Sequence, residues 1–165
     1  MSRLLLIILL LFSFSTAYCQ ENILIGDSQT FYLAKHSNKI KLIKKLTKSG
    51  IGIVKLNRMV KSYTIDKEVK TITLCIGVND CYNDRGINEL FNTVKRTFPN
   101  SKIFIVQGSW GWGRVRKVQK DKIIKYYKKF EDLGCTIISK PIGHGDPHRD
   151  KKVYKEIIKI VEECI

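Results

Sequence analysis

Residues 23–28 read Ile-Leu-Ile-Gly-Asp-Ser, an apolar run that ends in a glycine and two small polar residues. A short, continuous apolar run is typical of a strand that is buried on both faces of a parallel sheet. The Gly-Asp pair that follows favours a turn. The stretch therefore predicts a buried strand that delivers Ser28 at a strand-to-helix turn.

Similar apolar runs recur along the chain. They lie at residues 72–76, 103–106 and 136–138, with a weaker run near residues 51–54. Between the runs the hydrophobic spacing changes to that of amphipathic helices, at residues 87–94, 123–130 and 153–164. Strands that alternate with helices predict an α/β fold, with a parallel sheet of about five strands covered on both faces.

Polar clusters follow four of these strands directly. They are Gly26-Asp27-Ser28, Gly77-Val78-Asn79-Asp80, Gly108-Ser109-Trp110 and the segment 144–148. Ligands of such sheets bind outside the carboxyl ends of the strands, so these clusters are expected to meet at one edge. The spacing alone thus predicts an active-site rim.

The same residues resemble the SGNH (GDSL-like) serine hydrolases. Residues 23–28 are similar to the first block of that family, 49–52 to the second and 71–80 to the third, while His148, six positions before Tyr154, is similar to the last. The resemblance covers residues 20–165 and implies a three-layer α/β/α sandwich with a flavodoxin-like sheet. It also implies a serine esterase that needs no metal and no organic cofactor.

The resemblance assigns roles to particular residues. Ser28 is the expected nucleophile and His148 its general base, because a serine hydroxyl is a poor nucleophile until a base takes its proton. The backbone N–H groups of Ser28 and Gly52 and the side-chain amide of Asn79 are the expected oxyanion hole. The family places an aspartate three residues before the histidine, where this chain has a glycine. Asp146, two residues before, is the expected orienting acid, and a Ser–His dyad is the alternative.

Other residues near the predicted rim leave two interpretations open. Trp110 and Trp112 either bind substrate by stacking on sugars or lining an acyl pocket, or cap the core under a loop. Arg114 and Arg116 either bind an anionic group or begin a solvated helix. His144 is a competitor for the base role, whereas His36 is expected on the surface.

The amino-terminal residues 1–19 have the layout of a secretory signal peptide. Arg3 precedes an unbroken apolar run, and Ala17-Tyr18-Cys19 provides a small-x-small exit before Gln20. The run is short for a bilayer span, so a retained anchor is the minority interpretation. We therefore expect a secreted, extracellular domain at residues 20–165, with no transmembrane segment after cleavage.

The chain carries a net charge of +15, of which the leader contributes only Arg3. This charge predicts at most a weak attraction to anionic polymers or surfaces, because the lysines are spread over all expected helices. No nucleic-acid-binding motif is present. No CxxC pair suggests a zinc site. A disulfide between Cys135 and Cys164 is expected, because the last helix should run back toward the start of its preceding strand.

These observations together predict a secreted esterase that cleaves carboxylic esters, O-acetyl or short acyl, through an acyl-enzyme on Ser28. Its substrates would be small-molecule or carbohydrate esters. The alternative is a catalytically weak or inactive module of the same fold that binds glycans or acidic polymers.

Overall fold

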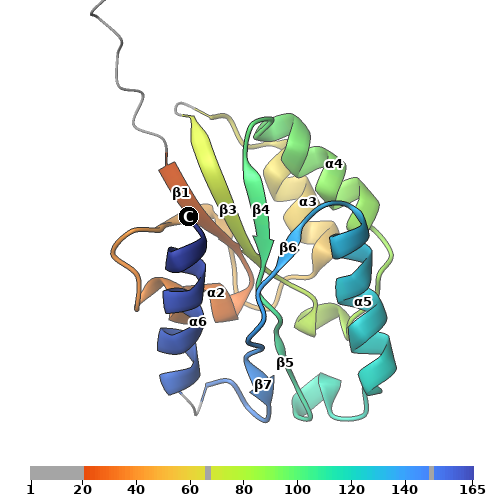
Figure 1. The fold of residues 1–165 in the computed structure, drawn as a ribbon. Helices are drawn as coiled ribbons and strands as arrows, with labels where there is room; N and C mark the ends of the chain where they lie inside the picture. The colour runs from red at the N-terminus through yellow and green to blue at the C-terminus, as the bar shows by residue number, and fades with distance from the viewer. Residues whose placement is uncertain (1–20, 66–67, 149–150) are drawn as a thin grey trace, which may run out of the picture.

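The computed structural model describes residues 21–65, 68–148 and 151–165, so the expected signal peptide lies outside the described residues. The described chain forms a parallel five-stranded sheet (Figure 1). Its strands are β1 (Glu21–Gly26), β2 (Lys41–Thr47), β3 (Val69–Cys75), β4 (Lys102–Ile105) and β6 (Thr136–Ile137), in the spatial order β2-β1-β3-β4-β6. This is the flavodoxin-like order, and the predicted α/β class is confirmed.

Helices cover both faces of the sheet and make three layers. On one face lie α2 (Ser28–Ala34) and α6 (Lys152–Cys164); on the other lie α3 (Ile53–Lys61), α4 (Ile87–Thr97) and α5 (Lys120–Asp132). Helix α5 ends in a Schellman motif, because the N–H of Cys135 donates to Phe130 O (3.1 Å) and that of Gly134 to Glu131 O (2.8 Å). No helix among residues 21–65, 68–148 and 151–165 is long and apolar enough to cross a membrane.

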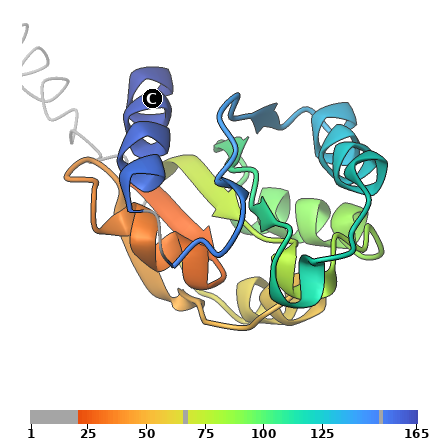
Figure 2. The same cartoon turned by 90° about the horizontal axis from the view of Figure 1, so that it is seen from below.

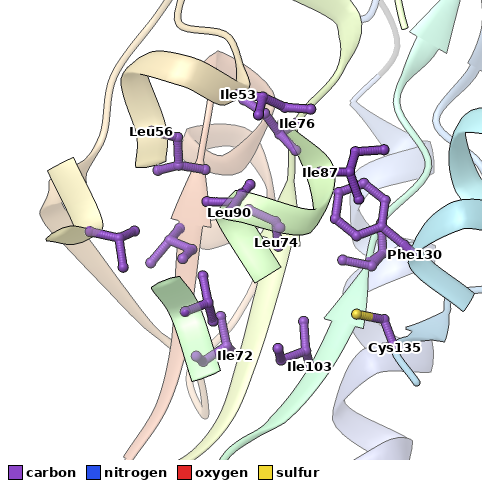
Figure 3. Packing of buried hydrophobic residues seen from close by; sticks show 14 of the residues in the cluster. Ile53, Leu56, Ile72, Leu74, Ile76, Ile87, Leu90, Ile103, Phe130 and Cys135 are labelled. Carbon is purple, nitrogen blue, oxygen red and sulfur yellow. The ribbon is translucent and has the colours of Figure 1, made fainter. Parts of the chain in front are cut away.

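The strands alternate their side chains between two hydrophobic clusters. In β1, Ile23 and Ile25 pack under α3 and α4, whereas Leu24 faces α2 and α6. The cluster under α3, α4 and α5 is drawn in Figure 3, where the side chains of β3 and β4 meet those of the helices. Burial on both faces explains why these strands are continuously apolar in the sequence.

The weak strand expected near residues 51–54 is wrong. The second strand is β2, and Ile53 is instead the first residue of α3. The three lysines of β2, in the sequence Lys-Leu-Ile-Lys-Lys-Leu-Thr, are exposed, because β2 lies at the edge of the sheet that the described residues form, beside β1. An edge strand carries charged side chains, so its apolar signal is weak.

The expected disulfide is also wrong. All four cysteines of the described chain are free thiols. Cys135 packs beside Ile103 and Phe130 in the cluster under α5 (Figure 3), whereas α6, which ends at Cys164, packs on the opposite face of the sheet. The sheet therefore separates the two sulfur atoms.

Short elements gather beyond the carboxyl ends of the strands. They are the 3₁₀ turns η1 (Val78–Asp80) and η2 (Gly113–Val115) and a two-stranded ladder of β5 (Ser109–Trp110) with β7 (Gly143–His144). Figure 2 looks at this edge of the sheet from below. The edge is where the sequence placed the four polar clusters.

Candidate active site

Ser28 begins α2 at a turn held by its neighbour Asp27. The N–H of Asp27 donates to Cys75 O of β3 (3.0 Å), and its Oδ1 accepts from the N–H of Gln29 (2.9 Å). An aspartate that accepts from the second helical N–H is a helix N-cap. Asp27 and Gln29 are buried while Ser28 between them is half-buried, so the turn leaves the serine at the surface of the sheet edge.

Asp27 also holds the side chain of Asn79. Nδ2 of Asn79, in η1, donates to Oδ2 of Asp27 (3.2 Å). Burial is the main reason why the pKa of Asp27 is raised to about 7, and the negative charge of the nearby Asp80 raises this pKa further. The hydrogen bonds that Asp27 accepts from Gln29 and Asn79 act in the opposite direction. An amide nitrogen carries two hydrogens. One of them is donated to Asp27. Because Asn79 is only half-buried, the other N–H can reach another acceptor.

Gly52 lies directly under the carboxylate of Asp80, the last residue of η1. Oδ2 of Asp80 accepts from the N–H of Ile53 (2.5 Å). This bond satisfies one of the N–H groups in the first turn of α3 that have no partner within the helix. A Cβ at position 52 would stand 1.7 Å from Oδ1 of Asp80, so any side chain there would displace this carboxylate. Within the described residues no acceptor takes the backbone N–H of Gly52 or that of Ser28.

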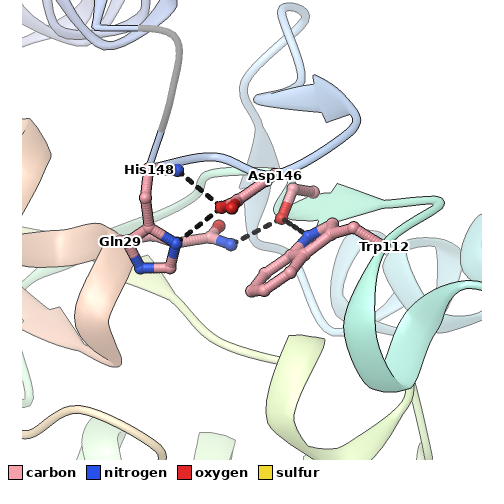
Figure 4. Close-up of polar contacts among 5 residues, drawn as sticks. Gln29, Trp112, Asp146 and His148 are labelled. Atoms are coloured by element: carbon pink, nitrogen blue, oxygen red, sulfur yellow. Dashed lines mark hydrogen bonds and ion pairs between the residues drawn. The ribbon is translucent and has the colours of Figure 1, made fainter.

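Asp146 and His148 form a hydrogen-bonded pair (Figure 4). Nδ1 of His148 lies 2.7 Å from Oδ1 of Asp146, and the same oxygen accepts from the backbone N–H of His148 (3.0 Å). An aspartate that accepts from the N–H two residues later makes an Asx turn. This turn brings the carboxylate of Asp146 to the ring of His148, although Asp146 is two residues before the histidine and not three. In a neutral imidazole, a proton on Nδ1 that is donated to the carboxylate leaves the lone pair of Nε2 available to act as a base.

The ring of His148 packs between two aromatic side chains. It meets Tyr32 edge to face at 5.4 Å and Trp112 at 5.6 Å between ring centroids. Tyr32 lies one helical turn after Ser28 in α2 and stacks on the buried Tyr154 of α6 (5.3 Å). The imidazole is thus held against the helix that Ser28 begins. No hydrogen bond joins Ser28 and His148 in the described structure; such bonds are often long before substrate binds.

A buried polar contact that the sequence analysis missed fixes Trp112. Nε2 of Gln29 donates to Oγ of Ser109 (2.8 Å), and Nε1 of Trp112 donates to the same oxygen (2.8 Å), as Figure 4 shows. Gln29 is 1 % exposed and Ser109 is fully buried. No local sequence pattern signals this contact, because Gln29 and Ser109 lie 80 positions apart and the burial of Gln29 appears only in the folded chain.

The remaining sequence candidates lie further out on the same edge. Trp110, in β5, is half-buried and packs against the hydrophobic core. His144, in β7, is exposed. Its ring lies against Gly111, because a Cβ built on that glycine would be 2.2 Å from Nε2 of His144. His36 is exposed beyond the end of α2. The ring of His148 is the one that packs against an aromatic ring of α2, that of Tyr32.

Two open cavities flank Trp112. One of about 220 Å³ contacts Asn79, and one of about 500 Å³ contacts Asp146. In the described part of the chain no group of three His, Cys, Asp or Glu side chains could hold a metal ion. The arrangement can supply a hydroxyl, an oriented imidazole and amide donors at one edge of the sheet.

Comparison with family models and with curated protein sequences gave no match. Solved structures did match. A lipolytic protein of the G-D-S-L family from Veillonella parvula has 12 % identity and a TM-score of 0.63, over 87 % of this chain and 97 % of that one. A family 2 carbohydrate esterase with a carbohydrate-binding domain from Corynascus thermopiles has 13 % identity and a TM-score of 0.66, over 88 % and 65 %.

A third similar structure is the C-terminal catalytic domain of peptidoglycan O-acetyltransferase A from Streptococcus pneumoniae. It has 14 % identity and a TM-score of 0.60, over 87 % of this chain and 91 % of that one. At such identities the likeness establishes the fold. The fold is the one that these proteins share, and it is the fold that the sequence motifs implied.

Proposed function

We propose that this chain, which has the fold of SGNH/GDSL hydrolases, is a serine esterase that forms an acyl-enzyme on Ser28. The observation that carries the proposal is the Asp146–His148 pair, with 2.7 Å between Nδ1 and Oδ1, packed against the helix that Ser28 begins. The amide of Asn79, held by Asp27, supports it as an oxyanion donor.

The proposed reaction has two halves. Oγ of Ser28 attacks the ester carbonyl carbon while its proton passes to Nε2 of His148. The carbonyl oxygen becomes negatively charged and accepts from the N–H groups of Ser28 and Gly52 and from the amide of Asn79. The C–O bond then breaks, and the alcohol leaves with the proton from His148. Water, deprotonated by the same nitrogen, attacks the acyl-enzyme and releases the carboxylic acid and Ser28.

We propose short acyl groups on carbohydrates as substrates. The cavity beside Asn79, about 220 Å³, has room for an acetyl or similarly small group. The structural neighbours include carbohydrate esterases and a peptidoglycan O-acetyltransferase. The half-buried rings of Trp110 and Trp112 offer apolar faces of the kind on which sugars stack.

Hydrolysis of p-nitrophenyl acetate tests the proposal. Ser28→Ala should abolish turnover above the uncatalysed rate, whereas Ser62→Ala, at an exposed serine after α3, should leave it unchanged. Circular dichroism of both variants checks that they fold. An undiminished rate in Ser28→Ala would assign the activity to another group.

A glycan-binding module without catalysis is the second candidate. Two observations favour it: the side chains of His148 and Asp146 are 40 % and 34 % exposed, and Ser28 and His148 are not hydrogen bonded in the described structure. Such a module would bind O-acetylated glycans equally well before and after Ser28→Ala and would show no turnover with either protein.

We also propose that residues 1–19 are removed on secretion and that the domain acts outside the cell. The net charge of +15 would add a weak, salt-sensitive attraction to anionic polymers. Amino-terminal sequencing of the protein from culture medium tests secretion, and Gln20 is the expected first residue. Retention of the intact protein in the cell would contradict this proposal.

A further inference from the structure

Trp112 separates the rim of the candidate site into two sides. The smaller cavity, on the side of Asn79, is lined by Val78, Asn79, Trp112, Gly113, Arg114 and Val115. The larger, about 500 Å³, is lined by Gly111, Trp112, Gly113, Arg116, Gly145 and Asp146. In the proposed reaction the oxyanion donors hold the acyl carbonyl and His148 protonates the alcohol. On this basis we assign the acyl group to the smaller cavity, which Asn79 lines, and the alcohol part to the larger one, which Asp146 lines.

The turn that carries Trp112 presents two arginines to these cavities. Arg114 lines the acyl side and Arg116 the alcohol side, and both are exposed. Between them Val115 is 1 % exposed, its N–H donates to Trp112 O (2.9 Å) and its carbonyl accepts from the N–H of Gly111 (3.1 Å). The buried side chain of Val115 and these two backbone hydrogen bonds fix the conformation of the turn, so the backbone that carries both arginines is held in place.

Neither arginine is neutralised within the described residues, where no carboxylate pairs with the guanidinium of Arg114 or Arg116. Asp146 also lines the larger cavity, but its Oδ1 accepts from His148. A guanidinium has five N–H donors in a planar fork that matches carboxylate and phosphate groups. The alcohol side thus carries an unpaired anion-binding group beside the acid–base pair.

Resting on the proposed function, we propose that the site prefers esters whose alcohol part carries an anionic group, held by Arg116. A carboxylate and a phosphate share the required chemistry, and both occur on acidic polysaccharides. The preference should appear chiefly in KM, because the anion is bound equally in the ground state and the transition state.

Matched aryl acetates test this proposal. The purified protein is assayed with 4-acetoxybenzamide, which is neutral, with 4-acetoxybenzoate and with 4-acetoxyphenyl phosphate, each corrected for its uncatalysed rate. One charge-assisted hydrogen bond at an open site should lower KM about five- to tenfold for an anionic substrate. Arg116→Gln should abolish this preference. Arg96→Gln, which removes the same charge from an exposed site near the end of α4, should retain it.

The outcomes separate this proposal from the proposed function. Hydrolysis of all three substrates with equal KM, or an equal effect of Arg116→Gln and Arg96→Gln, overturns the anionic preference and leaves the esterase standing. Hydrolysis of none of them overturns the esterase itself. A preference for only one of the two anions supports the proposal and identifies the group that Arg116 binds.

A different observation, the buried contact of Gln29 with Ser109, carries a second inference. We infer that Gln29 and Ser109 are positioning residues that hold Trp112 against the ring of His148. Oγ of Ser109 accepts from both Gln29 and Trp112 at 2.8 Å, and the indole meets the imidazole at 5.6 Å. Because Gln29 directly follows Ser28, one contact links the helix of the nucleophile to the packing of the base.

Tryptophan fluorescence tests this second inference. In a Trp110→Phe background Trp112 is the one tryptophan of the sequence. Acrylamide should quench its emission more strongly in Gln29→Met and in Ser109→Ala than in the parent, because the indole is no longer held against the imidazole. Each variant should also lower kcat several-fold, with KM little changed. Variants that fold and keep both the quenching constant and the kcat of the parent would overturn the inference.

Discussion

Replacing Gly52 by alanine is the perturbation for which the structure gives the most definite expectation. The added Cβ would lie 1.7 Å from Oδ1, 2.3 Å from Cγ and 2.4 Å from Oδ2 of Asp80. Because non-bonded atoms need about 3.5 Å, the carboxylate must leave its place over position 52. Asp80 then loses its bond to the N–H of Ile53, which begins α3.

The expected magnitude follows from that lost bond. A helix cap contributes about 1 kcal/mol, and a hydrogen bond to a charged group up to about 3, so Gly52→Ala should lower the free energy of unfolding by about 1–3 kcal/mol. Asn79 adjoins Asp80 in η1, so the rearrangement also displaces two of the three proposed oxyanion donors. Loss of one donor typically lowers kcat by about 10²–10³.

Urea denaturation and p-nitrophenyl acetate hydrolysis measure the two effects. Gly50→Ala is the control, because no atom lies within 4 Å of a Cβ there, and its φ of +72° adds only backbone strain. In an Asp80→Ala background, Gly52→Ala should cost little further stability, because the clashing carboxylate is gone. A Gly52→Ala protein with normal stability and turnover, or an undiminished cost in that background, would refute the reasoning.

Asp146→Asn should lower kcat by up to about 10⁴-fold in steady-state kinetics, because an amide at this position can stabilise the wrong tautomer of His148. A variant with wild-type turnover would show that Asp146 is not needed and that the site works as a Ser–His dyad. Burial raises the pKa of Asp27 from 3.8 to about 7, so the native state keeps a proton that the unfolded chain releases. The free energy of unfolding should therefore fall as pH rises through this window and then level off. Asp27→Asn should flatten that slope in urea titrations at stepped pH; an unchanged slope would assign it to other groups. Peptide mapping without reductant should find the cysteines of the described chain as free thiols, and a Cys135–Cys164 bridge would contradict the separation of these residues by the sheet.

The parts of the fold that the sequence predicted are those buried on both faces. The apolar runs of β1, β3 and β4 fill two clusters at once, so their composition reports the environment directly. The edge strand β2 faces solvent with lysines, and its signal was lost. The disulfide pairing failed because it depends on which face of the sheet each helix covers. That choice is made by packing over the whole domain.

The candidate site divides in a similar way. Ser28, Asn79 and His148 follow strand ends, so the chain order and the parallel sheet sufficed to place them together at one edge. The spacing of Asp146 could not be judged without the Asx turn that it makes with His148. The contact of Gln29 with Ser109 joins residues 80 positions apart, and no local pattern reports it.

Labelling with a fluorophosphonate, followed by peptide mapping, tests the central claim most directly, because such a probe reacts only with an activated serine. The account predicts a single modified site at Ser28, with labelling lost in Ser28→Ala and strongly slowed in His148→Ala. A folded protein that the probe does not modify, or that it modifies at another residue, would contradict the account.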